Sequence, residues 1–328
     1  MKKLISIVTP IYNETNNIQQ YLDTLFKQTS QSFHVILIDD GSTDNSVELI
    51  KELLGRNKQN FSFSYEILSQ KNSGAAKARE VGIKHASTDY ILILDCDDAI
   101  SEDMIYKTEQ CILDHPSDIY FPNVQIQLAD NSYHAFKFYD ERQTYTGLEA
   151  LEYSLVHWQV HGSTCVKRTI FLKSYYQYSQ YNPHHNNYIN NDEVITRLNF
   201  MNAEYTQKYD GVYFYQNNEN STTKKINNQR FLICQNAIFM YELFGKDMGH
   251  ISIKAQQELI NTFWGTLRYY RKNISHISNS EDWVNEFHKT LCFLKKNRKN
   301  MKLSWKSKTR LIRANYLLKK LKDRKSVV

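Results

Sequence analysis

The sequence has 328 residues, of which 41% are hydrophobic and 23% charged, values typical of a folded globular protein. No apolar run approaches the roughly 20 residues that a membrane-spanning helix needs. The five cysteines are widely spaced and odd in number, which argues against a disulfide framework or a zinc site and predicts a cytoplasmic protein. The net charge of +6 is unevenly distributed, because residues 295–328 hold fourteen lysines and arginines against one aspartate.

The N-terminal part of the chain alternates between strand and helix patterns. Hydrophobic, β-rich runs predict four strands, at residues 4–9, 35–38, 63–68 and 90–94. Apolar residues at helical spacing predict helices between them, at residues 18–26, 47–54 and 74–85. This alternation is typical of βαβ units and indicates an α/β fold with a parallel sheet. After residue 223 the pattern is almost entirely helical.

Polar residues follow each of the four predicted strands, in the segments 10–14, 39–42, 72–74 and 95–98. The carboxyl ends of parallel strands meet at one edge of a sheet, where such folds bind their ligands. We therefore expect the four segments to form one site.

Two acidic motifs suggest what that site binds. Asp95 and Asp97 can hold a hard divalent cation together with phosphate oxygens, although acidic pairs also cap helices. Such a metal would neutralise charge on a departing diphosphate. In the second motif, an aspartate at residues 39–44 can accept a hydrogen bond from a uracil or a ribose, while Ser42 or Thr43 is expected to cap the next helix.

In order and spacing, four segments resemble family 2 of the inverting glycosyltransferases. They are residues 6–14 (SIVTPIYNE), 38–44 (IDDGSTD), 72–79 (NSGAAKAR) and 94–98 (LDCDD). A weaker resemblance continues to about residue 223. Together, these resemblances imply that residues 1–223 have a GT-A fold, which is Rossmann-like, with a mostly parallel central sheet flanked by helices. Residues 224–328 would then be a helical C-terminal region with a basic amphipathic tail.

The resemblance also implies a role for each matching residue. Asp40 would meet the uracil edge with support from Asp39, and Asp95 and Asp97 would hold the ribose and a Mn²⁺ or Mg²⁺ ion. The implied donor site consists of Pro10, Tyr12, Glu14, Asp39, Asp40, Lys77, Arg79, Asp95 and Asp97.

The family's catalytic base matches Asp192. The residue before it is Asn191, where the family usually has glutamate. Gln216 and Asn218 stand where many members carry arginine and histidine.

Three further residues are candidates for the acceptor side: Trp158, His161 and His185. Trp158 and His161 could stack on an acceptor sugar or simply pack as aromatic side chains. His185 belongs to a polar loop before Asp192, which is either a solvated loop or an acceptor-side lid.

These features predict a metal-dependent, inverting, hexosyltransferase-type enzyme that moves a sugar from a UDP-sugar to a hydroxyl group. The acceptor would be a surface polysaccharide, a lipid-linked glycan or a glycoprotein. The alternatives are a non-catalytic nucleotide-sugar or glycan-binding protein of the same fold, and a sugar nucleotidyltransferase. The second alternative usually has a glycine-rich basic loop after the first strand, which residues 10–15 lack.

The C-terminal tail has an apolar side surrounded by lysines and arginines. Its members are Leu311, Ala314, Leu317, Leu318 and Leu321. A basic amphipathic helix suits an anionic membrane surface and would place the protein at the inner face of the cell membrane. A helix packed on the rest of the chain, or an oligomer contact, is the alternative. Nucleic acid is disfavoured because the rest of the chain is acidic and lacks a reader motif.

Overall fold

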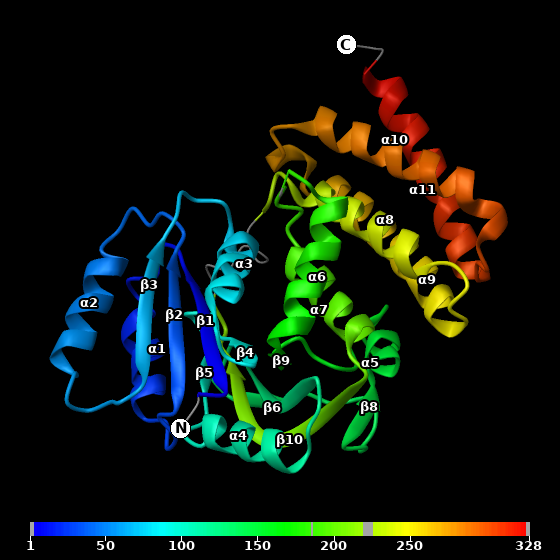
Figure 1. Ribbon diagram of the computed structural model, residues 1–328. Coiled ribbons are helices and arrows are strands. Elements are labelled where there is room, and N and C mark those ends of the chain that lie inside the picture. Colours follow the sequence, from blue (N-terminus) through cyan, green and yellow to red (C-terminus); the bar gives the residue numbers. More distant parts are fainter. Residues whose placement is uncertain (1–2, 185, 219–225, 326–328) are drawn as a thin grey trace. The chain divides into compact units, whose positions relative to one another are not determined.

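The computed structural model describes residues 3–184, 186–218 and 226–325, with side chains as far as Leu318. The chain divides into two compact units (Figure 1). The first contains residues 1–150, 159–187 and 195–218, and the second contains residues 151–158, 188–194 and 219–328. The boundary expected near residue 223 falls among residues 219–225, outside the described residues, and stays a prediction.

The first unit is an α/β domain, as predicted. Its strands are β1 (Ile5–Ile11), β2 (Phe33–Asp39), β3 (Ser64–Ser69), β4 (Tyr90–Ile93), β5 (Ala99–Ile100), β6 (Ile119–Gln127), β7 (Tyr133–Ala135), β8 (Thr144–Thr146), β9 (Cys165–Lys167) and β10 (Tyr205–Tyr215). Its helices are α1 (Ile18–Phe26), α2 (Ser46–Arg56), α3 (Ala75–His85), α4 (Met104–Asp114) and α6 (Arg168–Tyr181). The division between the units falls within α5 (Gly147–Ser154) and α7 (Asn191–Asn202).

The sheet has the strand order β3-β2-β1-β4-β9-β6-β10-β5. The first four strands are parallel, with Ile5 of β1 opposite both Phe33 of β2 and Tyr90 of β4. β9 lies antiparallel between β4 and β6, so the sheet is mixed beyond β4. The parallel register places the carboxyl ends of β1, β2 and β4 at one edge.

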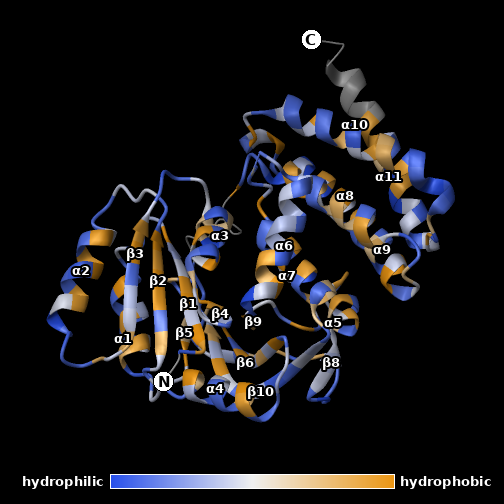
Figure 2. Ribbon diagram, viewed as in Figure 1, coloured by the Kyte–Doolittle hydropathy of each residue, from blue (hydrophilic) through white to orange (hydrophobic). Residues whose placement is uncertain are grey.

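The two faces of the sheet are covered by different helices. Ile5 and Ile7 of β1 point toward the core that includes buried residues of α1 and α2, whereas Val8 points the other way, toward α3. A Cβ atom at Gly82 of α3 would lie only 2.5 Å from a methyl group of Val8, so glycine allows the close approach of helix and sheet. Figure 2 shows hydrophobic residues concentrated along β1 and β2.

Two helices of the first unit were not predicted, and the capping residue of one helix was predicted wrongly. α4 and α6 have no counterpart among the expected elements, and α6 buries tyrosines such as Tyr175 and Tyr178 rather than an aliphatic stripe. α2 begins at Ser46, where the Asp44 carboxylate accepts the Ser46 N–H at 3.0 Å. Ser42 and Thr43 therefore do not cap α2.

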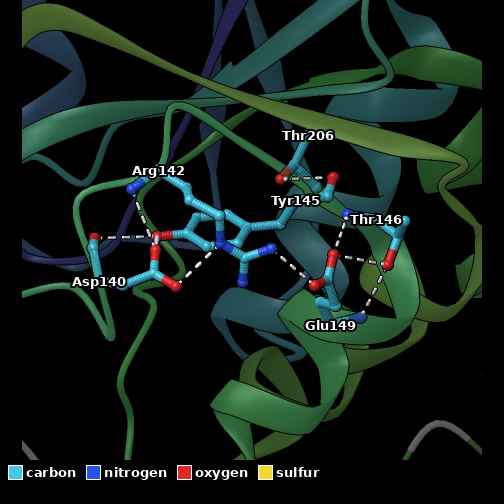
Figure 3. A network of polar contacts seen from close by, with 6 residues as sticks. All are labelled: Asp140, Arg142, Tyr145, Thr146, Glu149 and Thr206. Atoms are coloured by element: carbon cyan, nitrogen blue, oxygen red, sulfur yellow. Dashed lines mark hydrogen bonds and ion pairs between the residues drawn. The ribbon is translucent and has the colours of Figure 1, made fainter.

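A polar network fixes the turn from β8 into α5 (Figure 3). The Thr146 hydroxyl accepts the Glu149 N–H at 3.2 Å, and the Glu149 carboxylate accepts the Thr146 N–H at 2.8 Å, which is a capping box. Arg142 bridges the carboxylates of Glu149 and Asp140, at 2.8 and 2.9 Å. The Tyr145 hydroxyl also donates to Asp140, so the start of α5 is held by several charged and polar groups.

The second unit is helical, in agreement with the predicted helical C-terminal region. Its helices are α8 (Ile233–Phe244), α9 (His250–Asn273), α10 (Ser280–Asn297) and α11 (Trp305–Lys325), with 3₁₀ turns at Arg230–Leu232, Ile274–His276 and Arg298–Asn300. Trp283 is fully buried in its core and stacks on Tyr270 at a ring-centroid distance of 5.4 Å. None of the helices in the described parts of the chain combines the length and hydropathy of a membrane span.

The apolar side predicted for the C-terminal tail packs within this unit. Ala314 and Leu318 are buried in its core, and Leu311 and Leu317 pack against that core. The side chain of Leu321 lies outside the described residues. For this side of α11, the alternative of a helix packed on the chain is the one that the structure supports.

Candidate functional site

The loops after β1 and β2 are joined by side-chain hydrogen bonds. Asn13 has a φ of 57°, in the left-handed region that asparagine tolerates better than most residues. Its N–H donates to the Ser42 hydroxyl at 3.1 Å, and its side-chain oxygen accepts the Thr43 N–H at 2.8 Å. The next residue, Glu14, donates its N–H to the Ser46 hydroxyl at 2.8 Å. These bonds fix the backbone that carries two predicted donor-site residues, Tyr12 and Glu14.

Asp40 joins the end of β2 to the loop after β3. The carboxylate is 2% exposed and accepts three hydrogen bonds, from the Gln70 side chain at 2.7 Å and from the N–H groups of Ser73 and Gly74, both at 2.8 Å. Gly74 has a φ of 88°, a conformation that favours glycine, and it immediately precedes α3. Asp40 thus positions this loop, a function that the sequence did not reveal, and its contact with a uracil stays a prediction.

Replacing Asp40 should therefore destabilise the fold. In Asp40→Asn the amide NH₂ group would face one of the three groups that now donate a hydrogen bond to the carboxylate, and that bond would be lost. We therefore expect the free energy of unfolding to fall by about 1–3 kcal/mol. Asp39→Asn is the matched control, because the Asp39 carboxylate accepts a single loop N–H, from Ser42 at 2.9 Å, which an amide oxygen can also accept. Urea denaturation would measure both variants, and equal stability of the two would contradict the role given to Asp40.

The acids after β4 have partners from two other elements. One guanidinium nitrogen of Arg79, in α3, lies 2.7 Å from each carboxylate oxygen of Asp95. The Asn218 side chain donates to one oxygen of Asp97 at 2.9 Å. Burial raises the pKa of Glu14, and the negative charges of Asp97 and Asp95 raise it further. The carboxyl ends of β1 and β4 thus form an acidic site, with Arg79 against one of its acids.

The arrangement fits a divalent cation shared with phosphate groups. Within the described residues no cluster of three or more acidic, histidine or cysteine side chains could hold a metal by itself. Mg²⁺ in nucleotide-binding enzymes needs only one or two carboxylates, since phosphate oxygens and waters complete its shell. Asp97, with one oxygen not engaged by Asn218, and Asp95 meet that requirement.

Asp98 was missed as a candidate residue, although it directly follows Asp97. Its carboxylate is buried, accepts the Tyr213 hydroxyl at 2.6 Å and the Gln216 N–H at 2.9 Å, and burial raises its pKa to about 7. These bonds tie the end of β10 to the acidic loop and place Asn218 beside Asp97. A run of two aspartates was the only signal in the sequence, and it does not say which one turns inward.

Other predicted donor residues lie at or near the same edge. Pro10 is partly buried near the end of β1, and Tyr12 is exposed in the loop that follows. Lys77 lies 2.8 Å from Glu80, a buried acid that also pairs with Lys84. Burial would raise the pKa of Glu80, but these two lysines lower it. Lys77 therefore pairs within α3, and its contact with a donor stays a prediction.

His161 lies in an aromatic cluster of the first unit. Its Nε2 is 2.8 Å from the carbonyl oxygen of Pro122, and its ring is 5.1–5.3 Å from those of Phe121, Phe136 and Phe138. Burial lowers the pKa of His161 to about 3. The packing alternative accounts for these contacts, and none of them requires an acceptor sugar.

Because the His161 pKa is about 3 in the fold and about 6.5 in an unfolded chain, this residue should make the protein acid-sensitive. Its contribution is complete above pH 6.5 and is lost as the pH falls toward 3. At pH 5 the loss relative to neutral pH is about 2 kcal/mol. His161→Phe, which lacks the titrating group, should show a correspondingly smaller loss in unfolding experiments across this range. An unchanged pH dependence would contradict this account, and a specific loss of sugar transfer would restore the acceptor role.

The remaining candidates belong to the second unit or lie outside the described residues. Trp158 is partly buried in the second unit, and His185 is outside the described part of the chain. Asp192 is the second residue of α7 and is exposed. Asp192 thus belongs to a different unit from Asp95 and Asp97, and its catalytic role stays a prediction.

The residues before Asp192 are held by a buried amide cluster that the sequence did not indicate. The Asn236 side chain, fully buried in α8, donates to the side-chain oxygens of Asn190 at 2.9 Å and Asn191 at 3.0 Å. Ile189 has a φ of 73°, which is rare for a β-branched residue and is a form of backbone strain that clusters at functional sites.

The sheet with its acidic carboxyl-end edge and the helical region after it have the architecture of GT-A glycosyltransferases. The structure resembles S. aureus TarS 1–349, crystallised in complex with UDP-GlcNAc, with a TM-score of 0.62 and 18% identity over 88% of this chain and 80% of that one. The family model "Glycosyl transferase family 2" matches residues 6–175, just over half of the sequence. The chain therefore belongs to glycosyl transferase family 2, a family of transferases, and the resemblance seen in the sequence is confirmed.

Curated relatives match the N-terminal part of the chain. Glycosyltransferase GlyG of Streptococcus pneumoniae serotype 4 is 37% identical over 124 residues, which are 38% of this chain and 40% of the relative. An uncharacterized glycosyltransferase of Haemophilus influenzae is 39% identical over 104 residues, 32% of this chain and 40% of the relative. The chain thus spans about two fifths of the length of each of these relatives.

Proposed function

We propose that the protein transfers a sugar from a UDP-sugar to a hydroxyl group of a glycan or glycoprotein acceptor, with inversion at the anomeric carbon. The observation that carries the proposal is the convergence of Glu14, Asp40, Arg79, Asp95 and Asp97 at one edge of the sheet. The complex of TarS with UDP-GlcNAc supports the choice of donor, since the two proteins share a fold. Tyr12, Lys77 and Pro10 complete the proposed donor pocket.

In the proposed reaction, Asp192 accepts the proton of the acceptor hydroxyl while the acceptor oxygen forms a bond to the anomeric carbon. The bond from that carbon to the diphosphate breaks, and UDP leaves with the electron pair. Asp192 is suited to this role because it is exposed in the first turn of a helix, where free N–H groups and the helix dipole favour a negative charge. The amide cluster of Asn190, Asn191 and Asn236 would hold its backbone in place.

Asp95 and Asp97 would hold a Mn²⁺ or Mg²⁺ ion that neutralises charge on the departing diphosphate. Arg79, paired with Asp95, would orient that carboxylate and contribute positive charge to the donor side. Asn218 donates to Asp97, and the sequence resemblance would match it with a residue that is histidine in many family members.

The acceptor and the location complete the proposal. A surface polysaccharide, a lipid-linked glycan or a glycosylated protein would be the acceptor, with Trp158 on the acceptor side. Cytoplasmic synthesis is supported by five cysteines that form no disulfide. The basic C-terminal region would bring the enzyme to the inner face of the membrane.

The metal requirement can be tested by screening UDP- and GDP-sugars for UDP or GDP release. Activity should disappear in EDTA and return with Mn²⁺ or Mg²⁺. Asp97→Asn should lose most activity and remain folded, whereas Asp210→Asn, at an exposed aspartate of the same unit, should be unaffected. Full activity in thoroughly chelated buffer would exclude the metal, and pyrophosphate release from a nucleoside triphosphate would indicate a nucleotidyltransferase instead.

The catalytic role of Asp192 can be separated from its effect on helix stability by Asp192→Asn. In the first turn of α7, asparagine loses only the interaction of a negative charge with the helix dipole, about 0.3–1 kcal/mol, but it cannot accept the acceptor proton. We therefore expect a folded protein with unchanged UDP-sugar affinity in thermal-shift titrations and transfer reduced by at least roughly a hundredfold. Glu193→Gln, in the same helical turn, is the matched control and should retain transfer. Near-normal transfer by Asp192→Asn would show that Asp192 only stabilises the start of the helix.

A further inference from the structure

Helix α11 carries two apolar faces, one buried in the core of the second unit and the other largely exposed. Ala314 and Leu318 are 0% and 1% exposed in the core of the second unit, with Leu311 packed against the same core. The Arg310 guanidinium is hydrogen-bonded to Asn261 of α9, which holds this side of α11 to its neighbour. This face is occupied by the protein itself and is not available to a partner.

The side chains of the second apolar face are largely exposed. Trp305, Ile312 and Tyr316 are 82%, 67% and 56% exposed. They are seven and four positions apart, so the three side chains start within about 40° of one another around a helix of 3.6 residues per turn. Isolated exposed apolar residues are common on protein surfaces. Tryptophan, isoleucine and tyrosine in one row are instead the composition that enters the interface of a lipid bilayer.

Positive charge accompanies this row. Lys306, Lys308 and Arg313 are exposed on the same helix. Residues 295–318 contain nine lysines and arginines and no aspartate or glutamate. Long basic side chains can reach lipid phosphates while the apolar residues beside them enter the membrane surface.

A small cleft between α10 and α11 combines the same two properties. Its volume is about 110 Å³, and Lys295, Arg298 and Lys308 surround it together with Ile312 of the exposed row. The other lining residues are mainly apolar, namely Leu291, Leu294, Leu303, Leu311 and Asn315. Cations beside apolar side chains match the chemistry of an anionic phospholipid, whose phosphate adjoins its hydrocarbon chains.

We propose that the row Trp305, Ile312 and Tyr316, with the cations around it, docks on the surface of an anionic lipid bilayer. This inference rests on the proposed function, which places the enzyme at the membrane, and it names the surface that makes the contact. The contact surface is not the leucine side predicted from the sequence but another face of the same helix. A second copy of the chain is a poorer occupant, because it would bring two basic surfaces together.

The test uses the full chain and vesicles of phosphatidylcholine, with or without about one third phosphatidylglycerol. In flotation assays the protein should bind the anionic vesicles, and added salt should weaken binding. Trp305→Ser/Ile312→Ser/Tyr316→Ser should bind at least about tenfold more weakly. Leu243→Ser/Ile274→Ser, at two exposed apolar residues elsewhere in the same unit, should bind like the wild type.

Fluorescence gives a second readout. Binding should shift the tryptophan emission to shorter wavelength and allow quenching by brominated lipids, and Trp305→Phe should abolish most of both effects.

If the triple variant does not fold in a thermal scan, Lys306→Gln/Lys308→Gln/Arg313→Gln is used in its place and should also bind the anionic vesicles more weakly. Equal binding to neutral vesicles, wild-type binding by a folded triple variant, or quenching that survives in Trp305→Phe would overturn the proposal. UDP release in solution is measured separately, so failure of vesicle binding and failure of the proposed transfer are distinguishable.

Discussion

The site depends on the parallel pairing of β1 with β2 and β4. This register brings the loops that contain Tyr12, Asp40 and Asp97 to one edge, although the chain enters that edge from three separate strands. Hydrogen bonds then connect the loops to each other. Asp40 fixes the loop before α3, α3 supplies Arg79 to Asp95, and Asp98 fixes the end of β10 beside Asp97.

A consequence of this convergence is a concentration of carboxylates at one edge of the sheet. Asp95 and Asp97 are separated by one residue, and Glu14 is near enough for their charges to raise its pKa. Arg79 offsets part of that charge. A site of this kind favours a cation, and a cation would offset the repulsion between these carboxylates and a diphosphate, which is why the metal and the donor are proposed together.

Features fixed by local pattern were predictable from the sequence, whereas features that depend on distant partners were not. The four parallel strands and their polar ends follow from short hydrophobic runs and turn residues, and they were predicted correctly. The helix α6 was missed because its buried residues include two tyrosines and a serine, whose polar groups hide the helical period. Asp98 and Asn236 gain their importance from residues over 40 positions away, so no local pattern marks them. For α11, sequence periodicity identified an apolar side but not the neighbouring helices that cover it.

The amide cluster of Asn190, Asn191 and Asn236 also has a consequence for how the second unit can be exchanged. Residues 188–194 and α8 belong to the same unit although more than 40 residues separate Asn191 from Asn236. The family model ends at residue 175, so both segments lie beyond the part of the chain that defines the family. A chimera that took only the helices after residue 225 from another member would leave Asn190 and Asn191 facing a foreign α8. An exchange that respects the structure would move residues 151–158, residues 188–194 and the C-terminal helices together.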